Sequence, residues 1–128
     1  MSIVLVSVWI GSIIFFSSII APTVFKSLDE KSAGLFLRAF FPKYYVFGII
    51  IGVLAIVIDV KSHDNLAFLL IGSMIVLSFI SRGLIPMINN ARDMGDTGKD
   101  KFKKLHTFSV VLNVVTLLIG LVYIYNLI

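Results

Sequence analysis

The sequence contains no cysteine and few charged residues. Without a thiol, the chain cannot form a disulfide, a thiolate metal site or a catalytic cysteine. Charged residues make up 14% of the 128 positions and hydrophobic residues 59%, whereas an average soluble domain has roughly 25% charged residues. This composition indicates a protein of the lipid bilayer that has almost no soluble part.

Four apolar stretches are long enough to cross a hydrocarbon core of about 30 Å, which takes about 20 helical residues. The first has no basic region before it and no cleavage site of small residues, so we expect it to be retained and not removed as a signal peptide. The fold class that follows is an all-α integral membrane four-helix bundle in one domain, residues 1–128. The predicted spans are 3–25, 44–60, 66–88 and 106–127.

The basic residues follow the predicted loops. Of eleven lysines and arginines, only Lys61 lies between spans two and three, and the others lie near the two remaining connections. By the positive-inside rule, both basic loops face the cytoplasm and both termini face outward, as expected in a bacterial inner membrane. Since the charge is distributed by loop and forms no soluble basic surface, we expect no nucleic-acid partner.

Two segments resemble each other at half the chain length. Residues 15–29 align with residues 79–93, and Pro22 then matches Pro86. The match is either a parallel repeat of two helical hairpins or a chance similarity between apolar helices, and the residues leave both interpretations open. Each proline lacks an N–H and frees a carbonyl four residues earlier, so a kink is predicted at both sites.

The connection after the first span has a helix signal of its own. Ser27 and Glu30 have the spacing of a capping box, with Ser27 as the N-cap. Apolar residues then recur at helical spacing up to Phe41. A short amphipathic helix over residues 28–41, lying in the inner interface, is therefore predicted, with Pro42 in the first turn of the next span.

Small and polar residues form stripes along the spans. In lipid, small residues permit close helix packing, and hydroxyls or amides bond across helices. The stripes predict either interhelical packing or a polar cleft for a ligand. The predicted packing positions are Gly11, Gly48, Gly52 and Gly120, and the candidate polar interior consists of Ser18, Ser81, Arg82, His106, Ser109, Asn113 and Thr116.

Arg82 is a charge within the third span, about six residues from its inner end. Its side chain is long enough to snorkel to a lipid phosphate. The alternatives are an internal pair with a freed carbonyl or an acid, for which Asp29, Glu30 and Asp93 are the candidates, and a functional anion site.

The aromatic residues and the histidines are expected near the two membrane interfaces. Trp9, Tyr44, Tyr45, Tyr123 and Tyr125 suit the aromatic belts at the two interfaces. The two histidines fall on opposite faces of the membrane, and no acidic cluster has ligand spacing, so no metal site is predicted.

The stretches "GSIIFFSSIIAPTVFKSL" and "LHTFSVVLN" resemble the transmembrane-protein-205-like family. The resemblance implies a small four-helix membrane protein. More distantly, Trp9, Gly11 and Pro22 look like the superfamily of copper-resistance D proteins and membrane protoporphyrinogen oxidases. Those oxidases have a histidine in the first helix and this chain has none, so no cofactor is predicted, although haem stays possible.

Three functions compete. The first is an accessory or assembly component without evident catalytic machinery, which packs against other membrane subunits or forms a homo-oligomer. The second is a small-solute or ion transporter that acts as an oligomer. The third is a haem- or quinone-associated redox protein. Whether the chain is an enzyme stays open at this level.

Overall fold

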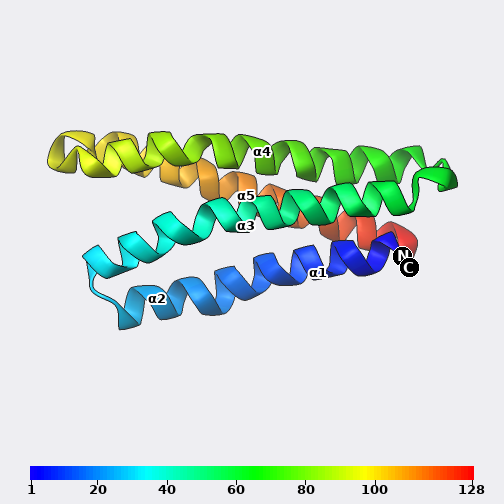
Figure 1. Cartoon of the computed structure of the whole chain (residues 1–128), viewed down its shortest axis with the longest axis horizontal. Helices are drawn as coiled ribbons and strands as arrows, with labels where there is room; N and C mark the ends of the chain where they lie inside the picture. Colours follow the sequence, from blue (N-terminus) through cyan, green and yellow to red (C-terminus); the bar gives the residue numbers. More distant parts are fainter.

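The computed structural model describes all 128 residues, which form an up-and-down bundle of long helices (Figure 1). Four helical segments are long and apolar enough to span a membrane. The predicted all-α integral membrane four-helix bundle is confirmed. The first segment comprises α1 (Ser2–Phe15), the π-helical turn η1 (Phe16–Ile20) and α2 (Ala21–Ser27); the others are α3 (Glu30–Ile58), α4 (Asn65–Asp93) and α5 (Lys99–Leu127).

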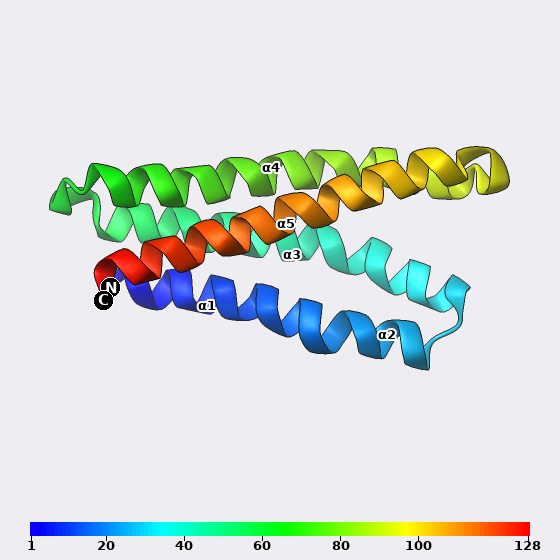
Figure 2. The ribbon, with the colours of Figure 1, turned by 180° about the vertical axis from the view of Figure 1, so that it is seen from behind.

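The bundle has two chemically distinct ends. Both termini and the connection that holds the short 3₁₀ turn η2 (Val60–Ser62) lie at one end, which we call the terminal end (Figures 1 and 2). The α2–α3 connection and the 3₁₀ turn η3 (Gly95–Gly98) lie at the other, which we call the basic end. Most lysines and arginines lie at or near the basic end.

Helix α3 corrects the predicted interfacial helix. Residues 30–58 form one continuous helix of 29 residues, in which Pro42 is an interior position. Ser27 is the last residue of α2, and the N-cap of α3 is Asp29, so the predicted capping box is wrong. The apolar positions of the expected short helix continue in phase with those of the second span, and one helix can therefore bury both. The buried positions along it are Ala33, Leu37, Tyr45, Gly48, Gly52 and Ala55.

The two aligned prolines lie in different local structures. Pro22 is at the start of α2, directly after the π-helical turn η1. A π-turn shifts the backbone hydrogen bonds from the i−4 to the i−5 carbonyl and often occurs at functional sites. Pro86 lies inside α4, which continues as a single α-helix. The local irregularity is therefore confined to the first of the two aligned segments.

The apolar core lies in the half of the bundle nearer the terminal end. Trp9 is 3% exposed, and a Cβ at Gly48 would lie 2.4 Å from its Nε1 atom. Gly52 and Gly120 have similarly close neighbours, Ile75 with Trp9 and Ile10, respectively. In lipid the hydrophobic effect does not drive helices together, so close packing at small residues is what stabilises a bundle. The core comprises Val6, Trp9, Ile10, Ile13, Ala55, Ile71, Met74 and Tyr123.

Two aromatic residues assigned to the membrane interfaces are instead part of this core. Trp9 packs on the glycines of α3, and Tyr123 is 2% exposed with its hydroxyl hydrogen bonded to Ser2. Tyr125 is exposed at the terminal end. The reason is that a large ring fills the space that glycine leaves on the facing helix, and this packing decides the position of Trp9.

Candidate functional site at the basic end

Two hydrogen bonds join α3 to α5 near the middle of the bundle, where Tyr44 and Asn113 are the central residues of their helices. The Tyr44 hydroxyl donates to Asn113 Oδ1 at 3.0 Å, and the hydroxyls of Tyr45 and Ser109 are 3.2 Å apart. Tyr45 is 5% exposed, and Tyr44 is half-buried. Both tyrosines were expected in the headgroup region. That expectation is wrong because α3 begins well before them and places them inside the bundle.

Two further polar residues of the predicted interior are satisfied within their own helices. Ser81 and Thr116 are buried, and their hydroxyls donate to the carbonyls of Leu77 and Leu112 at 2.9 and 2.8 Å. No buried side-chain nitrogen or oxygen in the chain lacks a partner. The fully buried polar groups therefore leave no free donor or acceptor for a ligand to satisfy.

Three other predicted interior residues lie outside. Ser18 is exposed on η1, and His106 is exposed on α5, where its ring stacks on Phe102 with centroids 5.7 Å apart. Arg82 is exposed on α4 and makes no ion pair or hydrogen bond. The internal-pair interpretation of Arg82 is therefore wrong for this chain, and its candidate acids lie elsewhere.

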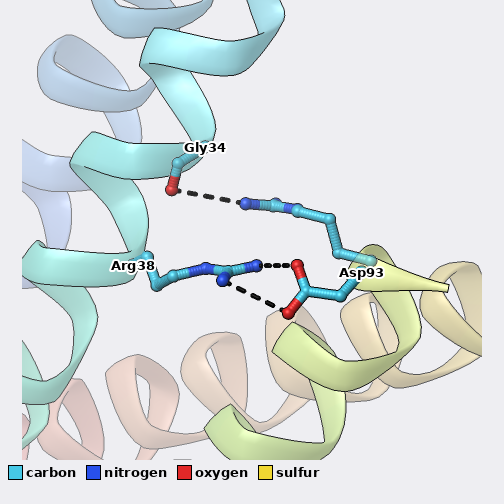
Figure 3. A network of polar contacts seen from close by, with 4 residues as sticks. Gly34, Arg38 and Asp93 are labelled. Carbon is cyan, nitrogen blue, oxygen red and sulfur yellow. Dashed lines mark hydrogen bonds and ion pairs between the residues drawn. The ribbon is translucent and has the colours of Figure 1, made fainter. Parts of the chain in front are cut away.

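Two other arginines connect the helices at the basic end, and sequence reasoning missed both contacts. Arg38 of α3 forms a two-pronged ion pair with Asp93 of α4, in which Nη2 and Nη1 lie 2.6 and 3.3 Å from the two carboxylate oxygens (Figure 3). Arg92, the neighbour of Asp93 in α4, donates from Nη1 to the Gly34 carbonyl at 3.4 Å. Its guanidinium also lies 5.0 Å from the centre of the Phe102 ring. One residue thus contacts both α3 and α5.

These residues border an open cavity of about 640 Å³ at the basic end. The N-terminal turns of α3 and the last turn of α4 form its walls. Seven of its eight lining residues are charged or glycine, and they carry charges of both signs. The lining residues are Asp29, Glu30, Lys31, Gly34, Leu35, Arg38, Arg92 and Asp93.

A second, smaller hollow of about 230 Å³ lies between the first helical segment and α3. An aromatic cluster borders it, in which Phe16 of η1 stacks on Phe40 with ring centroids 4.9 Å apart. Six of its eight lining residues are hydrophobic. The hollow is therefore an apolar contact surface, whereas the cavity at the basic end offers ionic contacts.

The chemistry of this end is ionic contact and hydrogen bonding. No group of three or more histidine, aspartate or glutamate side chains in the chain is arranged to hold a metal ion. The charged groups instead meet as cation and anion across α3 and α4. Such an arrangement can hold two helices together or bind a small charged group.

Comparison with known proteins gives a family but no activity. A family model described as "Domain of unknown function (DUF4149)" matches residues 4–97. An uncharacterized protein of Aquifex aeolicus (strain VF5) is 30% identical over 121 residues, which cover 94% of this chain and 89% of that protein. No solved structure matches.

Proposed function

The chain belongs to the family of the domain of unknown function DUF4149, and from that premise we propose that it is a non-catalytic accessory or assembly component of the membrane. It packs against other membrane subunits or against a second copy of itself. The fold supports the general part of this proposal, since the chain consists almost entirely of spans. The specific part rests on the outer face of α1.

That outer face carries exposed small residues. Ser7 and Gly11 lie about 40° apart on a helix of 3.6 residues per turn, and Ser18 is exposed on the π-helical turn that follows. A Cβ built at Gly11 has no atom within 4 Å. Gly11 was predicted as a packing position, and it packs against no helix of its own chain.

Small residues on a lipid-facing surface favour contact with another helix. A glycine within a helix is about 1 kcal/mol less favourable than alanine, and in membranes small residues mark the faces where helices approach closely. The exposed face of α3 shows the contrast, because Val46, Ile50, Val53 and Val57 are all large. We infer that the α1 face, and not the α3 face, meets a partner helix.

Cysteine cross-linking in the native membrane tests this, because the chain has no cysteine of its own. Gly11→Cys places a thiol on the α1 face, and Ile50→Cys places one at similar depth on the α3 face. The proposal expects a covalent species of higher mass from Gly11→Cys alone, and mass spectrometry of that species identifies a second copy or another subunit. Equal cross-linking from both positions, or none from either, would contradict the proposal.

Orientation and location form part of the same proposal. The basic end faces the cytoplasm and the termini face outward, in a bacterial inner membrane, because lysine and arginine are retained on the cytoplasmic side. The kinship with transmembrane-protein-205-like proteins is likewise proposed from the residues of α1 and α5. An Asn126→Cys variant in intact cells should react with a membrane-impermeant maleimide. If that thiol reacted only after the cells were opened, the C-terminus would face the cytoplasm and the proposed orientation would be wrong.

Two alternatives are addressed with the same preparation. An oligomeric small-solute transporter would use the polar pairs of Asn113 and Ser109, but both already have partners on α3. A haem protein would show Soret absorbance after gentle extraction from its own membrane. Packing is favoured because every buried polar side-chain atom is already satisfied.

A further inference from the structure

The charges that line the cavity at the basic end divide into a closed pair and an open set. Arg38 and Asp93 neutralise each other through their two-pronged contact. The cations that remain are Lys31 and Arg92, and the acids that remain are Asp29 and Glu30. None of these four makes an ion pair. The cavity thus presents free charge of both signs with no net charge.

Arg92 has the most free hydrogen-bonding capacity of the open set. A guanidinium has five N–H donors in a planar fork that matches phosphate oxygens. Arg92 uses one of them, in the 3.4 Å contact with the Gly34 carbonyl. The guanidinium carbon lies over the Phe102 ring, and this contact helps to fix its position. The remaining donors are free for an anion.

The lengths of α3 and α4 favour a position of the cavity at headgroup depth. Both α3 and α4 have 29 residues, about 43 Å of helix, whereas the hydrocarbon core is about 30 Å thick. If both helices leave the hydrocarbon near the terminal end, their other ends project beyond it by several residues. The single hydrophobic lining residue, Leu35, is largely exposed, as a residue beside lipid chains would be.

We propose that this cavity binds the phosphoethanolamine headgroup of a membrane lipid. The phosphate contacts Arg92 and Lys31, and the ammonium contacts the carboxylates of Asp29 and Glu30. A phosphocholine headgroup has no N–H to donate to those carboxylates, and a phosphoglycerol headgroup has no cation to place beside them. The balance of free charges therefore favours the zwitterion that can donate hydrogen bonds. This inference does not depend on the partner helix proposed for α1.

Native mass spectrometry of the delipidated full chain in detergent, titrated with dioleoyl lipids of the three headgroups, tests the proposal. We expect phosphatidylethanolamine to bind about tenfold more tightly than the other two, because a hydrogen bond to a charged group accounts for about that factor. Arg92→Gln should lose at least about tenfold, and Arg92→Lys should recover part of the loss. The double variant Asp29→Asn/Glu30→Gln should remove the preference for ethanolamine over choline.

Matched controls lie outside the cavity. Lys61→Gln removes an exposed cation of the turn at the opposite end of the bundle, and Asp96→Asn removes an exposed acid of the turn that follows α4, so both should bind lipid as the wild type does. Unchanged affinity of Arg92→Gln would overturn the proposal, as would equally tight binding of phosphatidylglycerol. Displacement of the lipid by an equal concentration of free phosphoethanolamine would overturn the assignment to a lipid.

Discussion

The two halves of the bundle are held together by different interactions. In the half nearer the terminal end, large side chains fill the space above glycines, and Trp9 over Gly48 and Gly52 is the main example. In the half nearer the basic end, arginines bridge α3 and α4, and near the middle of the bundle two tyrosines bond across to α5. The half nearer the terminal end is tightly packed, whereas the half nearer the basic end contains an open, charged cavity.

The difference suggests a division of roles. Tight packing has few alternatives and stabilises one arrangement, whereas exposed ionic contacts contribute little to stability. We therefore expect stability to reside mainly in the half nearer the terminal end, and lipid recognition at the basic end. Substitutions in the two halves should affect different measurements.

The largest effect is expected from emptying the packed half. Trp9→Ala removes a ring that is 3% exposed, and a buried aromatic truncated to alanine costs about 3–5 kcal/mol. Thermal or denaturant unfolding in detergent measures the loss. Phe79→Ala removes an exposed aromatic of α4 and should have a much smaller effect. Comparable losses from both variants would show that the core is not where the structure places it.

Overfilling the same half should have the next largest effect. Gly48→Ala places a methyl 2.4 Å from the Trp9 indole nitrogen, and overpacking typically costs about 1–3 kcal/mol. Gly83→Ala on α4 meets no atom within 4 Å and should stabilise the helix by up to about 1 kcal/mol. In the same unfolding assay, the changes in the free energy of unfolding should therefore have opposite signs. Destabilisation by both variants would contradict the packing account.

Breaking a hydrogen bond near the middle of the bundle should have a smaller effect. Tyr44→Phe removes the donor to Asn113, and hydrogen bonds between membrane helices average about 0.6 kcal/mol, with a maximum near 1.7. A double-mutant cycle with Asn113→Ala isolates the coupling between the two side chains. Tyr125→Phe, at an exposed tyrosine, should leave the free energy of unfolding unchanged. A coupling of zero would mean that the bond does not form in detergent.

The smallest effect is expected at the exposed ion pair. Arg38→Gln breaks the contact with Asp93, and such pairs are screened by salt and by water. The decrease in melting temperature should be less than that of Tyr44→Phe and should shrink at high salt. Arg82→Gln, at an arginine without a partner, is the control. A decrease that persists at high salt would show that the pair is more than a surface contact.

Hydropathy was sufficient to predict the four spans, because a bilayer requires long apolar helices. The rhythm of Gly48, Gly52 and Gly120 likewise predicted close packing, and each has a neighbour closer than 3 Å to its Cβ position. Gly11 follows the same pattern but faces outward. A small-residue stripe favours contact with another helix, and it does not show whether that helix belongs to the same chain.

The errors at the candidate site have a common origin in helix length. Dividing residues 30–58 into an interfacial helix and a span placed Tyr44 and Tyr45 at the membrane surface. In the structure, the single helix α3 carries them into the bundle. The pairing of Arg38 with Asp93 depends on the same continuous helix. The helical periodicity of the apolar residues alone could not show this, since Pro42 is equally compatible with the first turn of a new helix.

Thermal unfolding of Gly48→Ala and Arg92→Gln, each with and without added phosphatidylethanolamine, tests the division between the halves most directly. The account predicts that Gly48→Ala melts well below the wild type but keeps the full increase in melting temperature on addition of lipid. Arg92→Gln should melt close to the wild type without lipid and gain little from it. If both variants lost both properties together, stability and lipid recognition would not be divided between the two halves.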